Sequence, residues 1–188
     1  MAQAKSLTEI EIEQVLKYVS KTRYYKRNRA LVLTSFLSGM RVGEIAALKI
    51  KDVRNDDGSI KGEIRLTSHQ TKGHFGRTVF VNEKLRSELS NFLGDRKTTD
   101  YERPLFYTEK SKGFSANTLT QWFFWMYRKA GVSGASSHSG RRTMITSLAN
   151  KGIGVRVLAK LAGHRSIAVT QAYIDVNSDM MRKAVELV

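Results

Sequence analysis

The sequence predicts an α+β fold that is mainly helical and contains a small antiparallel β-sheet. The chain has 188 residues, of which 41% are hydrophobic, and this is enough to bury a core. Apolar side chains recur at helical spacing over most of the chain, whereas within residues 50–82 they alternate with polar ones between turn signals. We expect one compact domain over residues 7–175, an N-terminal extension over 1–6 and a tail helix over 176–188.

The N-terminal part of the chain predicts helices. Thr8 can cap a first helix, and Glu11 can close its capping box. A second apolar stretch covers residues 31–37, and a further short helix is expected over residues 45–48.

Residues 50–82 predict the sheet. The segment 55–58 (NDDG) is typical of a turn, and Ile64 and Leu66 occupy alternate positions that share one face of a strand. We expect three antiparallel strands, with Lys72 near the tip of a hairpin.

The remainder of the chain is expected to be helical, apart from a polar loop at residues 94–104. An aromatic cluster at 122–127 covers more than one helical face, so we expect core packing, with some rings meeting solvent or DNA. The expected helix boundaries are Asn82 to Gly94, Ser115 or Asn117 onward, Ser139 to Asn150, Val155 to Ala162 with Gly163 as the stop, Ser166 through Tyr173, and Asn177 or Ser178 onward.

The charge of the chain indicates a polyanionic partner. There are 32 Lys and Arg against 17 Asp and Glu, for a formal net charge of +15, and residues 21–175 hold the whole of this excess. A single basic run is more often a solvated face, but an excess of this size suits contact with phosphates.

Composition also excludes several classes of protein. The chain has no cysteine, which excludes disulfides, thiolate zinc sites and cysteine nucleophiles and fits a reducing compartment. No apolar run approaches the roughly 18 residues of a membrane span, and the N-terminal segment lacks the apolar core of a secretory signal. We therefore expect a cytoplasmic protein that does not contact a membrane.

Two segments place a cation beside glycine. In SGMRVGE, Arg41 precedes a helix start, and Glu44 can hold its guanidinium on the same helical face. Alone, such a pair is more often a structural ion pair. Lys72 lies in a glycine-bordered loop, where a lysine is usually only solvated but can also reach into a cleft and deliver a proton.

Two further segments contain histidine. His138 and Arg141 in SHSGRR are three residues apart, so at a helix start they can converge on one anionic group. His164 lies at a tight bend in LAGHRS, and Tyr173 follows nine residues later. By itself an H-x-x-R match is common, and an isolated tyrosine is normally a core or surface residue.

Taken together and in this order, these motifs resemble the catalytic domain of the tyrosine recombinase (phage integrase) family, from about Leu7 to Tyr173. The resemblance implies that 7–175 is a catalytic domain with the fold of DNA breaking-and-rejoining enzymes. It also implies that the scissile phosphate is surrounded by Arg41, Lys72, His138, Arg141 and His164, that Tyr173 is the nucleophile, and that Glu44 supports the first arginine.

The implied reaction is site-specific recombination, such as integration or excision of mobile DNA, through a 3′-phosphotyrosyl intermediate. The two arginines offer planar forks to the non-bridging oxygens of the phosphate. His138 is suited to taking the tyrosine proton, Lys72 to protonating the leaving 5′-oxygen, and His164 to hydrogen-bonding the phosphate. No metal and no other cofactor is expected.

The implied partner is double-stranded DNA in a bacterial or phage-infected cell. Self-association as a dimer or tetramer on DNA is expected through the tail helix 176–188, and a tail folded onto its own core is the alternative. The predicted DNA contacts are Lys21, Arg23, Lys26, Arg27, Arg29, Arg77, Arg142 and Arg165.

Two other functions remain open: DNA relaxation like that of type IB topoisomerases, and a non-catalytic DNA-binding module. Gly140 and Ala162 stand where the family usually has leucine, and Gly140 is expected to loosen its helix start. The family typically has an N-terminal domain that clamps DNA. Because none precedes Leu7 in this sequence, we expect a fragment of a longer protein.

Overall fold

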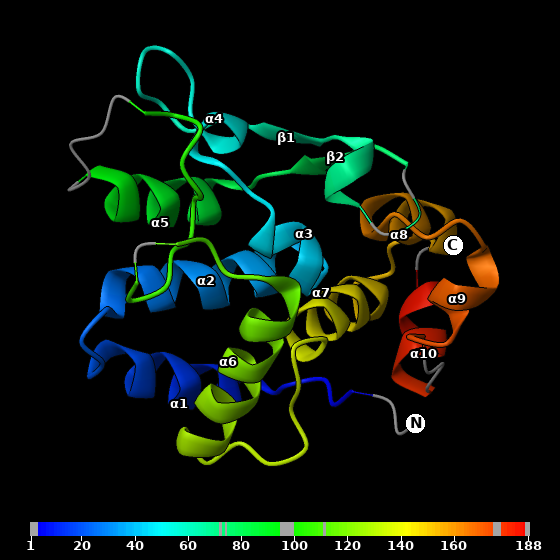
Figure 1. Ribbon diagram of the computed structural model, residues 1–188. Helices are drawn as coiled ribbons and strands as arrows, with labels where there is room; N and C mark the ends of the chain where they lie inside the picture. Colours follow the sequence, from blue (N-terminus) through cyan, green and yellow to red (C-terminus); the bar gives the residue numbers. More distant parts are fainter. Residues whose placement is uncertain are drawn as a thin grey trace.

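Helix α2 (Tyr25–Ser38) lies between α1 (Glu9–Ser20) and α5 (Glu83–Gly94) in the computed structural model (Figure 1). The structure describes residues 4–71, 73, 75–94, 100–110, 112–174 and 178–186. Residues 30–36 of α2 are all buried, because they are mostly apolar and no face of the helix is left for solvent. The fold is mainly helical, as the sequence predicts.

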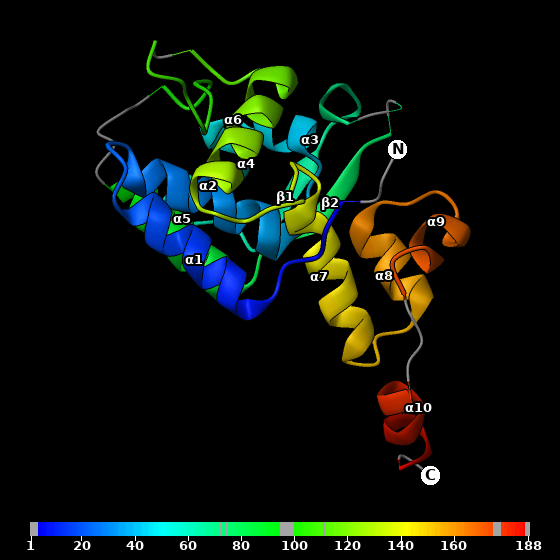
Figure 2. The same cartoon turned by 90° about the horizontal axis from the view of Figure 1, so that it is seen from below.

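The other helices extend this core toward one edge of the molecule. Helix α6 packs on α1 and α3, while α7 packs on α2 and carries α8, which packs in turn on α9 (Figures 1 and 2). Their bounds are α3 Val42–Ala46, α4 Ile50–Val53, a 3-10 turn at Ser68–Gln70, α6 Ala116–Lys129, α7 Ser139–Asn150, α8 Val155–Ala162, α9 Ile167–Gln171 and α10 Ser178–Val185.

Four helix starts have the caps that the sequence predicts. The Oγ1 atom of Thr8 accepts the Glu11 N–H at 3.2 Å, and the Glu11 carboxylate closes the capping box. In the same way Asn82 begins α5, Ser115 begins α6 and Ser166 begins α9. Each cap depends on residues within one turn, so the local sequence specifies it.

The sheet is smaller than expected. In the described part of the chain, β1 (Glu63–Leu66) pairs antiparallel with β2 (Arg77–Phe80). The expectation of three strands is wrong, since residues 54 and 60 form only an isolated bridge. Between them the Asp57 carboxylate accepts the Ser59 N–H at 2.8 Å and closes a tight turn.

Three helix boundaries also differ from expectation. Helix α3 begins at Val42, earlier than predicted, because Glu44 caps the Arg41 N–H. Residues 50–53 form α4 rather than part of the sheet. Helix α9 ends at Gln171, so Tyr173 lies just beyond the helix that was expected to contain it.

Helix α10 stands away from the body of the molecule (Figure 2). It begins at Ser178, and its Met181 and Val185 side chains are exposed. The alternative cap, Asn177, lies outside the described residues. No helix in the described part of the chain has the length and apolar character that crossing a bilayer requires.

Candidate active site

Arg41 lies where α2 gives way to α3. Gly39 ends α2 with φ +60°, a conformation that favours glycine, and the following turn places Arg41 just before α3. The Arg41 N–H donates to Glu44 Oε2 at 2.7 Å, and its Nη1 donates to Oε1 at 3.1 Å. The Nη2 atom donates to the Gly163 carbonyl at 3.1 Å. The predicted Arg41–Glu44 pair is therefore present and reaches the end of α8.

Arg141 comes from the first turn of α7 and is 3% exposed. Its Nη1 donates to the Gly39 carbonyl and its Nη2 to the Ala162 carbonyl, both at 2.6 Å. Burial and the charges of Arg41 and Arg77 lower the pKa of Arg141 to about 10, so it remains a cation at neutral pH.

Gly140 allows this arginine to approach the core. A Cβ atom at Gly140 would overlap Ser35 Oγ and lie 2.9 Å from Ser35 Cβ on α2. From the sequence, Gly140 is expected only to loosen the start of its helix; the structure shows that it also allows close packing against Ser35. Glycine is the residue that lets α7 lie this close to α2.

His164 accepts a hydrogen bond from Arg141. The His164 Nε2 atom lies 2.7 Å from Arg141 Nη2, and its Nδ1 lies 2.7 Å from Thr170 Oγ1. Because a guanidinium can only donate, Nε2 accepts, and we assign the ring proton to Nδ1. Burial, followed by the charges of Arg141, Arg41 and Arg77, lowers the pKa of His164 to about 4. The imidazole is thus neutral at pH 7.

Tyr173 lies against His164. The two rings are stacked with centroids 5.5 Å apart, and the Arg142 guanidinium lies 5.2 Å from the centre of the tyrosine ring. Tyr173, His138 and Arg142 line one cavity of about 300 Å³. Arg41 and Glu44 therefore form one group, and Arg141, His164 and Tyr173 form a second. The two groups meet at the adjacent Ala162 and Gly163 carbonyls, and His138 lies by Tyr173 at the smaller cavity.

Lys72 lies outside the described residues. Of its neighbours, Thr71 donates a hydrogen bond to the Phe75 carbonyl at 2.6 Å. Thr71 and Phe75 line a second cavity, of about 640 Å³, which also contains Arg41 and His164.

This larger cavity contains basic residues that the sequence analysis did not select. These are Arg156 and Lys160 of α8, and they line the cavity beside Arg165, which is one of the predicted DNA contacts. Their spacing of four residues places Arg156 and Lys160 on one helical face, which is the signal that could have identified them. Positive charge predominates in the cavity, because five cationic side chains line it together with the Glu44 carboxylate.

The predicted DNA contacts fall into two groups. Lys21, Arg23, Lys26 and Arg165 are exposed, and Arg142 is half-buried beside Tyr173. Three others have internal partners, because their charge neutralises or caps groups of the fold itself. Arg27 is 5% exposed and donates to the Tyr107 carbonyl, Arg29 forms a two-pronged pair with Glu88, and Arg77 pairs with Glu44. Arg27 is buried and the Arg77 side chain is 11% exposed, so the hydrogen bonds of both go to groups of the fold.

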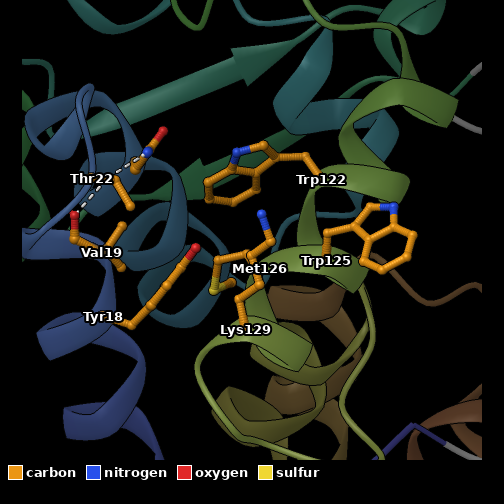
Figure 3. Close-up of a pocket in the computed structure, with 8 residues that line it drawn as sticks. Tyr18, Val19, Thr22, Trp122, Trp125, Met126 and Lys129 are labelled. Carbon is orange, nitrogen blue, oxygen red and sulfur yellow. Dashed lines mark hydrogen bonds between the residues drawn. The ribbon is translucent and has the colours of Figure 1, made fainter.

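The aromatic cluster of α6 divides between core and surface, as expected. Phe123 and Tyr127 are buried, whereas Phe124 and Trp125 are about half exposed. Figure 3 shows Trp122 facing Tyr18 of α1 across a cavity of about 540 Å³. This cavity shares no lining residue with the cavity of about 640 Å³ that contains Arg41 and His164.

Comparison with known proteins gives one family. The sequence profile of the phage integrase family matches residues 5–180. Tyrosine recombinase XerA of Pyrococcus furiosus is 32% identical over 185 residues, which cover 97% of this chain and 61% of XerA. The chain therefore spans about three-fifths of the length of this relative.

Two solved structures have the same fold. The crystal structure of a XerA recombinase gives a TM-score of 0.77 at 26% identity, covering 100% of this chain and 66% of that one. The Tn1549 transposon integrase, solved in complex with circular intermediate DNA, gives a TM-score of 0.76 at 20% identity and covers 100% and 67%.

Proposed function

Because this chain belongs to the phage integrase family, we propose that it is the catalytic domain of a site-specific DNA recombinase that cuts and rejoins double-stranded DNA through a 3′-phosphotyrosyl intermediate. The observation that carries the proposal is that Arg41 and Arg141 bind adjacent carbonyls at the end of α8, while His164 contacts both Arg141 and the ring of Tyr173. These residues come from three separate segments of the chain, around positions 41, 141 and 164. The tyrosine recombinase XerA and the DNA-bound Tn1549 integrase support both the activity and the partner.

The proposed reaction is a transesterification at phosphorus. The phenolic oxygen of Tyr173 attacks the scissile phosphorus, and the bond from phosphorus to the 5′-oxygen breaks. His138, which lines the same cavity, takes the phenolic proton, while Lys72 gives a proton to the leaving oxygen. The phosphotyrosyl ester keeps the bond energy, so a 5′-hydroxyl from a second strand can reverse the attack.

Arg41 and Arg141 have the role of stabilising negative charge. The non-bridging oxygens gain charge as the fifth bond to phosphorus forms, and each planar guanidinium can pair with them. In the free protein His164 accepts from Arg141 and so fixes its orientation. Removing one donor of this kind typically costs about two to three decades in rate.

The exposed cations hold the DNA backbone. Arg156 and Lys160 extend the basic cavity along α8, while Lys21 and Arg23 lie at the turn between α1 and α2. These side chains add phosphate contacts that are independent of base sequence.

Helix α10 joins subunits on DNA in this proposal. Its apolar Met181 and Val185 are 55% and 72% exposed, which suits packing on a second copy of the chain. A chain that ends after residue 174 should keep its melting temperature and bind one DNA site, but it should lose assembly into dimers or tetramers. Sedimentation with and without DNA measures this, and unchanged assembly of the truncated chain would rule out the tail as the connector.

The central test is a covalent adduct. Incubation with a library of nicked duplexes of random sequence, followed by SDS, should trap a protein–DNA adduct whose attachment site maps to Tyr173. Tyr173→Phe should bind DNA and form no adduct. Tyr25→Phe is the matched control, because Tyr25 is an exposed tyrosine on α2 outside the cluster.

Other outcomes identify other functions. Adduct formation by Tyr173→Phe at the wild-type level would end the assignment. DNA binding without an adduct in the wild type would indicate a non-catalytic module. Relaxation of supercoiled plasmid by a monomer, without strand exchange, would indicate topoisomerase-like chemistry.

A further inference from the structure

The C-terminal end of α8 binds three different arginines. Carbonyl groups in the last turn of a helix have no partner within the helix, and the helix dipole makes that end favourable for cations. Here three consecutive carbonyls each accept from a separate guanidinium. The pairs are Leu161 with Arg77 Nη1 at 3.0 Å, Ala162 with Arg141 Nη2 at 2.6 Å, and Gly163 with Arg41 Nη2 at 3.1 Å.

Arg77 differs from Arg141 because it also donates hydrogen bonds to Glu44, the residue whose carboxylate supports Arg41. Its Nε donates to Glu44 Oε1 at 3.2 Å and its Nη2 to Oε2 at 2.8 Å. The Glu44 side chain is 1% exposed and that of Arg77 is 11% exposed. One buried carboxylate is thus shared between Arg77, which uses both oxygens, and Arg41.

All three guanidinium nitrogens of Arg77 are bonded to the protein. Its Nε, Nη1 and Nη2 atoms each donate to a protein oxygen, and its side chain is nearly covered. These three bonds tie Glu44 to the end of α8, so a change at Arg77 acts on both.

We propose that Arg77 is a positioning residue for the recombination chemistry: it holds Glu44 and the end of α8 in place, so that Arg41 presents its guanidinium to the scissile phosphate. This inference rests on the proposed function. Without Arg77, Arg41 is the remaining cation hydrogen-bonded to the Glu44 carboxylate. The Oε2 atom, which Arg77 Nη2 binds in the intact protein, then attracts the Arg41 guanidinium and turns it away from the phosphate.

The conformation of Gly163 supports this proposal independently. Gly163 ends α8 with φ +64°, and a Cβ atom there would lie 2.5 Å from Arg77 Cδ and 3.0 Å from its Nε. The turn that places His164 beside Arg141 is therefore also built around the Arg77 side chain. Glycine at this position meets both requirements.

The test compares variants of Arg77 in single-turnover cleavage of the nicked duplex that the adduct experiment identifies. At saturating protein, Arg77→Met and Arg77→Lys should cleave about 10- to 100-fold more slowly, within the loss that follows removal of one phosphate donor, while DNA affinity changes little. Lysine should not restore the rate, since an ammonium cannot form the two-pronged pair. In a double-mutant cycle, Arg77→Met and Glu44→Gln should be strongly non-additive.

A substrate with a methylphosphonate at the scissile position separates positioning from general damage. This ester is neutral and makes less use of Arg41, so Arg77→Met should lose less rate on it than on the phosphate. A merely structural defect would slow both substrates equally. Glu88→Gln is the matched control: it breaks another two-pronged arginine–glutamate pair, between α2 and α5, and should leave cleavage unchanged.

The outcomes distinguish this inference from the proposed function. If the wild type forms no adduct at Tyr173, the proposed function itself fails. If the wild type cleaves through Tyr173 but Arg77→Met cleaves at the wild-type rate, or loses rate equally on both esters, the role of Arg77 is overturned. Should the methionine variant not fold, the lysine variant decides by the same comparison.

Discussion

At the scale of single residues, the chemistry of the site depends on His164 being neutral. Its Nδ1 donates to the buried Thr170 hydroxyl and its Nε2 accepts from Arg141. A protonated ring would have no acceptor for that guanidinium and would face three arginine charges. Neutral His164 therefore completes the hydrogen bonding of a buried cation.

This arrangement predicts a pH dependence of stability. The pKa of His164 is about 4 in the folded protein and 6.5 when unperturbed. As pH falls from 6.5 to 4, the unfolded chain takes up a proton that the folded chain does not. His164 thus lowers stability by up to about 1.4 kcal/mol per pH unit, and the effect saturates below pH 4.

Urea unfolding between pH 7 and pH 4.5 measures this effect. His164→Gln should lose less stability on acidification than the wild type does. Replacing the exposed His69 with glutamine should leave the wild-type slope unchanged. Equal slopes for wild type and His164→Gln would contradict a neutral histidine.

At the scale of elements, the sequence predicts where helices begin better than it predicts which elements pack against them. Thr8, Asn82 and Ser115 form caps with atoms of their own first turn, so the local sequence is sufficient. Helix α4 was missed, because a four-residue helix has too few positions to establish a period.

The same contrast holds for the site. Motifs predict a set of site residues and their order, whereas the contacts of Arg77 with Glu44 and α8 could not be read from the sequence. In the sequence, Arg77 is one basic residue of a predicted strand. Its contacts with Glu44 and the end of α8 join segments that are distant in the chain and form only in the folded protein. Gly140 shows the same limit, since its neighbour Ser35 is 105 positions away in the chain.

The space around two helical glycines predicts that they respond to alanine substitution in opposite directions. Gly43→Ala in α3 should stabilise the protein by about 0.5–1 kcal/mol, because alanine favours helix and its Cβ would have an ordinary contact at 3.7 Å. Gly140→Ala should destabilise it by about 1–3 kcal/mol, because the added methyl group overlaps Ser35.

Chemical denaturation of the two variants checks this prediction. Helix propensity alone predicts the same sign for both substitutions. A stabilised Gly140→Ala variant would therefore show that α7 can move away from α2 at little cost.

At the scale of the whole molecule, the distribution of charge governs DNA binding. The net charge of +15 is not all available, since Arg27 and Arg77 form hydrogen bonds with groups of the fold. The exposed cations around α8 and at the turn between α1 and α2 remain to displace counterions.

DNA affinity should consequently fall steeply with salt. Each phosphate contact contributes about −0.9 to the slope of log K against log salt. The double substitution Lys21→Gln and Arg23→Gln should make this slope about two contacts shallower. Fluorescence anisotropy over a salt series measures the slope, and a flat response in the wild type would contradict electrostatic binding.

The shared anchorage at the end of α8 links three cations to one eight-residue helix. If that helix frays, all three guanidinium groups lose a tether at the same moment, although the core around α2 stays intact. Thermal inactivation should then precede global melting and occur in a single step, with amide exchange in residues 155–163 rising at the same temperature as activity disappears.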